Sequence, residues 1–317
     1  MAKTSVEPAL VVHSSQQGSV GGLGRRKRNR LRQRGLPWIL PALIVSMGLI
    51  FYGMGYTGYV STLKWNGTDP DPLSVGAQNY VHAVQDPVVW QAIYHTVVYF
   101  IVTFFIQTAL GVVFAVLLHS KVKLGVIYKI IIFVPVVLAP SIMAPVFRQV
   151  YGADGQFNWL LQHLGLGSLA QPWLAQSSTS LAVIISIHIW EWTGLTFVLY
   201  YAAMSQIDPE ILEAARIDGA GNIRSLISII LPGVRGTTVA LAMLSAISAL
   251  KTFDVPWLVT IGGPNYATEF LGTLIYRVSI PESNVGYGAA LSIILLVLAL
   301  GMAILLQVRG RDKDGVS

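Results

Sequence analysis

The sequence predicts an all-α polytopic membrane protein with six transmembrane helices. Of its 317 residues, 54% are hydrophobic and only 11% are charged, whereas a soluble domain carries about 25% charged residues. Six apolar segments each approach the roughly 20 residues that a helix needs to cross the hydrocarbon core of a bilayer. This composition excludes a disordered chain and an ordinary cytosolic enzyme. Because the chain has no cysteine, it also excludes disulfides, thiolate metal sites and cysteine nucleophiles.

The six spans differ in their polar and helix-breaking residues. The first three contain no Asp, Glu, Lys or Arg. In the third, Pro135, Pro140 and Pro145 free backbone carbonyls and make the helix bendable. We expect the spans over residues 37–60, 90–118, 130–147, 181–203, 234–256 and 286–307.

Basic residues predict the orientation, because cytoplasmic loops of membrane proteins carry an excess of Lys and Arg. With a cytoplasmic N-terminus, 17 of the 21 Lys and Arg residues fall in the tails and inner loops. The other four, on the outer side and its span ends, are Lys64, Arg148, Lys251 and Arg277. We therefore expect both termini in the cytoplasm. The net charge of +6 does not indicate a nucleic-acid partner, since the basic run over 25–34 lies directly before the first span and orients it.

The remaining segments are tails and outer loops. Residues 1–36 predict a basic, disordered cytoplasmic tail, and 310–317 a second, short one. The outer loops are expected over 61–89, 149–180 and 257–285. Asn66-Gly67-Thr68 is formally a glycosylation acceptor, but so short a pattern often arises by chance.

The inner loop over 204–236 predicts structure of its own, beginning with a short helix. Asp208 suits an N-cap, because its side chain can accept from free backbone amides. Pro209 then takes the favoured first helical position. The helix should end at Gly219, where a left-handed residue can close the last turn.

A second short helix should begin near Asn222 and end at Pro232. Its apolar residues recur at helical spacing, and they are Ile223, Leu226, Ile227 and Ile230. The pattern alone fits two interpretations. One is a helix pair lying on the lipid headgroups, and the other is a docking element for a cytoplasmic partner.

Residues of this loop follow the pattern of a known family. The series Glu213-Ala214-Ala215, Asp218-Gly219-Ala220, Ile229 and Leu231-Pro232 resembles the EAA loop of permease subunits in binding-protein-dependent ABC importers. Ile207, Pro209 and Glu210 resemble the carbohydrate-importing branch, that of maltose and glycerol-phosphate permeases. Further matches are Trp190, Trp192, Gly194, Phe253-Asp254, Thr260, Gly262-Gly263-Pro264, Thr268, Tyr287-Gly288 and Ala289-Ala290. The resemblance covers about residues 90–309, and Gly236 departs from it where many members have proline.

The resemblance implies a type I ABC importer permease fold with a five-helix core over 90–309. It also implies a sugar permease in a bacterial or archaeal cytoplasmic membrane, in contact with lipid. The implied partners are a second permease subunit in a heterodimer, a cytoplasmic ABC ATPase dimer and an extracytoplasmic solute-binding protein. ATP and Mg would be used by the ATPase, because this chain has no phosphate-binding G-x-x-x-x-G-K-[ST] loop. The chain itself is expected to hold no cofactor, metal or catalytic site.

Two groups of residues are candidates for function. The resemblance assigns coupling to the ATPase to Glu213, Ala214, Ala215, Asp218, Gly219 and Ala220. Ionisable groups inside a membrane mark transport paths, and the candidates there are His188, Trp190, Glu191, Trp192, Lys251, Phe253 and Asp254.

Each substrate-path candidate also has a structural interpretation. Glu191 could hold a sugar with a neighbouring ring, or it could be a packed polar tie between helices. Only one of Trp190 and Trp192 should face the same cavity as Glu191. Lys251 and Asp254, three apart in the expected helix, favour a plain ion pair over an outer gate.

Two other classes of function compete with an importer subunit. A secondary transporter or channel would work without ATP and would leave the structured inner loop unexplained. A membrane enzyme would need paired acids, a His cluster or metal ligands, whereas the predicted membrane interior offers essentially Glu191. We therefore expect an importer permease.

Overall fold

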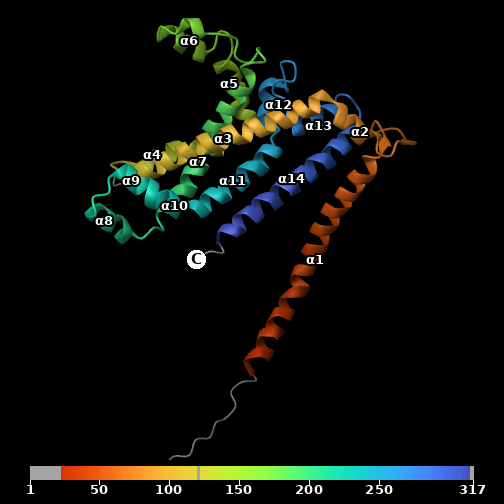
Figure 1. Ribbon diagram of the computed structural model, residues 1–317. Helices are drawn as coiled ribbons and strands as arrows, with labels where there is room; N and C mark the ends of the chain where they lie inside the picture. The colour runs from red at the N-terminus through yellow and green to blue at the C-terminus, as the bar shows by residue number, and fades with distance from the viewer. Residues whose placement is uncertain (1–22, 120–121, 315–317) are drawn as a thin grey trace, which may run out of the picture. The chain divides into compact units, whose positions relative to one another are not determined.

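The structure, a computed structural model, describes the backbone of residues 23–119 and 122–314 and the side chains of residues 38–119 and 122–305. Much of the predicted N-terminal tail and the last three residues therefore lie outside the described part. The chain forms two units, which divide after Tyr56 (Figure 1).

The first unit contains most of helix α1 (Leu23–Val60). The helix ends where the first span was predicted to end. It begins earlier, so that residues 23–36, expected in a disordered tail, are helical. The reason is local, because Leu, Arg, Lys and Gln dominate this stretch and all are good helix formers.

The second unit is built around three long helices, α3 (Pro87–His119), α7 (Ser180–Met204) and α14 (Val285–Asp314). They confirm the second, fourth and sixth predicted spans. In Figure 1, α3 lies along α7, and α11 lies between α3 and α14. Over its most apolar stretch α7 is 56% buried, against 28% for α3 and 22% for α14. Helix α7 is therefore the central helix of this unit.

The third predicted span is broken. It consists of α4 (Gly125–Phe133), a 3₁₀ turn η1 (Val134–Val137) and α5 (Pro140–Val150), and the two halves are bent by 99°. Prolines cause the break, since Pro135 lies in the 3₁₀ turn and Pro140 begins α5 after an extended residue. The prolines predicted a bendable helix, and in the structure the two halves lie nearly at right angles.

The fifth predicted span, over 234–256, is also wrong as a single helix. Helix α11 (Arg235–Leu250) stops, and α12 (Asp254–Thr260) starts after a three-residue break. Pro256 explains the break, because its ring would collide with the carbonyl of Thr252 in a continuous helix and it lacks the N–H to bond there. At its other end α11 meets the inner-loop helices at a bend of 66°.

The predicted outer loops contain regular structure. The first holds the antiparallel strands β1 (Leu63–Lys64) and β2 (Leu73–Ser74), with Leu63 opposite Ser74, and then α2 (Gln78–Gln85). The second holds α6 (Gln156–His163) and the 3₁₀ turn η2 (Gly167–Leu169). The third holds most of α12 and all of α13 (Leu271–Ser279).

Buried side chains form three clusters along the second unit. The central cluster includes Tyr99, Ile184 and Phe270, from α3, α7 and the segment before α13. A second cluster joins α2, α3, α13 and α14. A third lies where α3 and α7 approach the inner-loop helices, around Phe197 and Tyr200. The last cluster fixes the inner-loop helices to the spans.

Candidate functional site

The first inner-loop helix, α8 (Pro209–Ile217), begins and ends as predicted. The Asp208 side chain accepts from the backbone N–H of Glu210 at 3.0 Å. At the other end the N–H of Ala220 donates to the carbonyl of Ala215 at 2.9 Å. Gly219 between them has φ +77°, the left-handed conformation that glycine adopts without steric cost. Side-chain capping and glycine therefore fix both ends of α8.

The second inner-loop helix ends at Gly233, one residue past the predicted Pro232. It runs through α9 (Asn222–Ser225), a π-helical turn η3 (Leu226–Ile230) and α10 (Leu231–Gly233). The π turn shifts the hydrogen-bond pattern just before Pro232, a residue that lacks an N–H. The predicted apolar stripe is only partly covered. Leu226 and Ile230 pack against the spans, whereas Ile223 and Ile227 are exposed.

The coupling candidates lie on an accessible surface. None of the residues of α8 is buried, and Glu213, Ala214, Asp218 and Gly219 are exposed. Ala215 and Ala220 are half-buried. Beside them, the side chains of Ile217 and Ile223 are 86% and 74% exposed. These two apolar side chains are available for contact with another surface, and the sequence did not single out Ile217 because a helical pattern cannot say which turn stays uncovered.

A cavity of about 630 Å³ lies between α8, α9 and the ends of α3 and α7. Glu213 and Arg216 line it from α8, with His119 and Asn222 from the neighbouring helices. The side chain of Glu213 is thus placed at a recess beside the exposed face of α8.

The substrate-path candidates on α7 divide between two sides of that helix. Glu191 is 3% exposed, and the neighbouring His188 ring lies 4.9 Å from the ring of Tyr99 on α3. The Trp192 ring lies 6.0 Å from the His188 ring. Trp190 instead packs edge-on against Phe147, with ring centroids 5.1 Å apart. His188 and Trp192 therefore form one group, and Trp190 faces another neighbour.

Lys251 and Asp254 do not form the expected ion pair. Among the described side chains the one salt bridge is that of Glu269 with Arg277. The prediction fails because α11 ends before Lys251, so that helical spacing no longer places Lys251 and Asp254 on one face. Phe253, between them, has its ring 5.3 Å from that of Tyr276 on α13.

Comparison with known proteins identifies the family of this chain. The family described as the inner membrane component of binding-protein-dependent transport systems matches residues 36–312. The chain belongs to this family. It is a permease of an ABC importer, a multi-pass inner membrane protein that works with a binding protein and an ATPase.

Individual relatives cover nearly the whole permease. It is 29% identical over 275 residues to "Probable ABC transporter permease protein YurN" of Bacillus subtilis (strain 168), which covers 84% of this chain and 94% of the relative. It is 28% identical over 292 residues to the trehalose/maltose transport system permease protein MalF of Thermococcus litoralis, over 92% and 98% of the two chains.

The fold is shared with a solved structure. A chain in the crystal structure of a bacterial ABC transporter involved in the import of the acidic polysaccharide alginate superposes with a TM-score of 0.76. The sequence identity is 22%, and the match covers 91% of this permease and 99% of that chain. The predicted type I importer permease fold is thereby confirmed.

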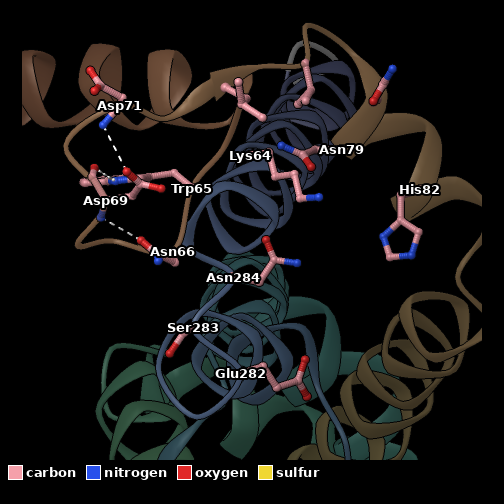
Figure 2. Close-up of a pocket in the computed structure, with 13 residues that line it drawn as sticks. Lys64, Trp65, Asn66, Asp69, Asp71, Asn79, His82, Glu282, Ser283 and Asn284 are labelled. Carbon is pink, nitrogen blue, oxygen red and sulfur yellow. Dashed lines mark hydrogen bonds between the residues drawn. The ribbon is translucent and has the colours of Figure 1, made fainter.

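The permease also has a polar cavity that holds none of the predicted site residues. Figure 2 shows this cavity of about 620 Å³, between the first outer loop and the turn after α13. Asn66, the formal glycosylation acceptor, lines it. Its side-chain oxygen accepts from the N–H groups of Thr68 and Asp69 at 3.0 and 2.8 Å. These hydrogen bonds explain why an asparagine stands at this position, so glycosylation is not needed to explain it.

Proposed function

We propose that this permease carries a mono- or oligosaccharide across the cytoplasmic membrane, with both of its termini in the cytoplasm. The family establishes the importer, and the distribution of basic residues supports the orientation. The observation that carries the sugar assignment is the relative from Thermococcus litoralis, a trehalose/maltose permease similar over 92% of this chain.

The group around Glu191 is the proposed place of sugar contact. A carboxylate can accept from sugar hydroxyls, and aromatic rings can pack against the apolar face of a sugar. Gln107 on α3 supports this placement, because its amide donates to the backbone carbonyl of His188 at 3.1 Å and fixes that turn of α7. The break over residues 251–253 adds Lys251, Phe253 and Asp254 to the proposed path, since unwound backbone inside a transporter occurs where it lines a cavity.

The exposed face of α8 is the proposed contact for a separate ATPase. Ala214 allows close approach of another surface, and Asp218 is free to pair with a basic group. The recess at Glu213 and Arg216 can receive a side chain of that partner. Large apolar side chains of α3 and α14 remain exposed, including Ile101 and Val297, and we assign part of this surface to a second permease in a heterodimer.

The proposal is tested by purifying the tagged chain in mild detergent from native membranes and identifying the proteins that accompany it. We expect an ATPase, a second six-span permease and a solute-binding protein, which can then be screened against sugars. A chain that purifies alone and moves solute in liposomes without ATP would support the secondary-transporter alternative instead. A binding protein that retains no sugar in the screen would contradict the sugar assignment alone.

Replacing Glu191 with glutamine is expected to raise the KM for the sugar found in that screen about tenfold, as for a lost charge-assisted hydrogen bond. Glutamine keeps the volume but not the charge, so the fold should persist. The measurement is uptake against sugar concentration in cells that lack the chromosomal gene. Trp190→Phe is the control, because Trp190 faces Phe147, and it should leave KM unchanged. An unchanged KM in Glu191→Gln would support the other interpretation, in which Glu191 is a packed polar contact between helices.

A further inference from the structure

We propose that Glu269, Arg277 and Arg148 are positioning residues that fix helix α12 to α3, α5 and α13. Movement of α11 is then absorbed by residues 251–253, the break between α11 and α12. These three side chains are called the α12 clamp below. The inference rests on the fold of the permease and not on the identity of its solute.

The centre of the clamp is a buried ion pair. Arg277 on α13 donates from Nη2 and Nε to one carboxylate oxygen of Glu269, at 2.8 and 3.1 Å. The side chain of Glu269 is fully buried, and that of Arg277 is 23% exposed. A buried ion pair adds little net stability over apolar packing, and its best-attested role is to specify one arrangement of the chain. We therefore interpret this ion pair as one that fixes the position of the residues after α12 relative to α13.

The same arginine reaches the end of α12. Its Nη2 donates to the carbonyl oxygen of Ile261 at 2.5 Å, and its guanidinium lies 5.6 Å from the Trp257 ring centroid. Carbonyls at a helix C-terminus have no partner within the helix and carry partial negative charge, so a cation is favourable there. Arg277 thus joins α13, Glu269 and the end of α12.

A second arginine holds the same helix end from another direction. Arg148 on α5 donates from Nε to the carbonyl of Val259 at 3.0 Å. On the third side, His95 Nδ1 of α3 lies 2.9 Å from the backbone oxygen of Glu269. Side chains of α3, α5 and α13 therefore form hydrogen bonds with the end of α12 and the residues after it.

The backbone after α12 is held in an uncommon conformation, as expected of a segment determined by its surroundings. Ile261 has φ +55°, and Tyr266 has φ +60°. Positive φ is costly for residues other than glycine and persists where neighbouring contacts enforce it. At Gly262 an added Cβ would collide with the Glu269 carboxylate and with Arg277. Glycine there lets the chain pass directly over the ion pair.

The opposite end of α12 is held by packing and not by ion pairs, since the Phe253 ring lies against Tyr276 of α13 and Val255 is buried in the central cluster. Helix α11 ends at Leu250, and within the described part of the chain neither Lys251 nor Asp254 takes part in a salt bridge. Helix α11 continues from the inner-loop helices through a bend of 66°, so motion at the proposed ATPase contact on α8 would be passed to it. Because α12 is clamped, the break at 251–253 is where α11 turns. Three substrate-path candidates, Lys251, Phe253 and Asp254, lie at or beside this break.

Spin labels can test the clamp, because the chain has no native cysteine to interfere. Cysteines are introduced at Ile261 and Ile280, which are exposed at the ends of α12 and α13. A second pair combines Ile261 with the exposed Leu244 of α11. In the purified importer, ATP with vanadate is expected to change the 244–261 distance and to leave the 261–280 distance unchanged. A change in 261–280, or none in 244–261 while nucleotide is trapped, would overturn the proposal.

Clamp variants supply the second part of the test. In Glu269→Gln the 261–280 distance distribution is expected to broaden about twofold, as for a locally released segment. Arg277→Lys keeps the charge but has one donor nitrogen in place of Nε and Nη2, and it serves if Glu269→Gln does not fold. The control is Glu282→Gln, an exposed acid in the turn after α13, which should leave the distribution narrow. A narrow distribution in both clamp variants would contradict the clamp.

A coupling measurement separates positioning from general damage. In clamp variants, ATP hydrolysis without binding protein should be retained, and its stimulation by the copurified binding protein should fall severalfold. Equal loss of both activities would indicate simple destabilisation. If no ATPase accompanies the chain, the proposed contact of α8 with an ATPase is at fault, and the width of the 261–280 distribution still tests the clamp.

Discussion

Replacing Gly219 with valine is expected to reduce solute uptake at least about tenfold while the chain still inserts into the membrane. Gly219 has φ +77°, where a β-branched residue is a steric outlier that costs about 1–2 kcal/mol. An added Cβ meets nothing within 4 Å, so the effect comes from the backbone and not from a collision. The turn between α8 and α9 must open, which moves the exposed face of α8 away from the position in which it contacts the ATPase.

The measurement is uptake of the sugar identified by screening the binding protein. Immunoblots of the membrane fraction establish that the variant is inserted. Uptake should fall about tenfold or more, in line with that strain. Gly219→Asn is the matched control, since asparagine tolerates the left-handed conformation better than other residues that have a side chain. It should keep most of the uptake. Normal uptake in Gly219→Val would overturn the assignment of this loop to coupling.

Replacing Gly194 with alanine is expected to destabilise the permease and lower the amount of folded protein. Gly194 is buried on α7, and its Cβ position lies against the backbone of α4, 2.9 Å from the Cα of Phe133 and closer still to the carbonyl oxygen of Ile132. Backbone atoms cannot move aside as a flexible side chain can, so α4 and α7 must separate. Overpacking of this kind costs about 1–3 kcal/mol.

The test is the thermal unfolding of the detergent-purified chain, measured by fluorescence-detected gel filtration. The melting temperature of Gly194→Ala should fall by several degrees. Gly301→Ala on α14 is the control, because an added Cβ there meets nothing within 4 Å and alanine favours a helix. Equal melting temperatures for the two variants would show that α4 and α7 are not in close contact in the membrane.

The inner loop could be predicted closely because its signals are local. Asp208, Pro209 and Gly219 each act through bonds within one helical turn, and the structure places all three as the sequence indicated. The end of the second helix was also predicted to within one residue, because a proline at 232 stops a helix. The π turn before it was not predicted.

The two broken spans show where hydropathy stops being informative. Apolar composition over 130–147 and 234–256 indicated spans, and bent helix pairs that are apolar enough to span include much of both segments, but composition does not give the direction of the backbone. Pro135 and Pro140 predicted bending, and the contacts with α7 set its extent. Pro256 was the available signal for the break before α12, because a proline prevents a helix from running through the residues ahead of it.

The α12 clamp could not be predicted from the sequence. Glu269 and Arg277 are eight residues apart, and their segment was expected to be an outer loop, where charged residues are ordinarily solvated. Arg148 was counted among the outer basic residues only to orient the spans. Burial of a carboxylate depends on a partner brought close by the fold, and no local pattern reports it.

The broken third span also constrains how this protein is made. Helices α4 and α5 have 9 and 11 residues, and at 1.5 Å per residue each is only about half the roughly 30 Å of hydrocarbon that a lone helix must cross. Between them the Leu138 N–H donates to the carbonyl of Pro135 and the Ala139 carbonyl accepts from α5, which leaves the peptide group that joins Leu138 to Ala139, and lipid cannot satisfy it. Neither half can therefore leave the translocon for lipid on its own during biosynthesis. The pair must wait for α7, whose Gly194 receives the backbone of α4, so that insertion of this part of the chain completes only after a later segment has been synthesised.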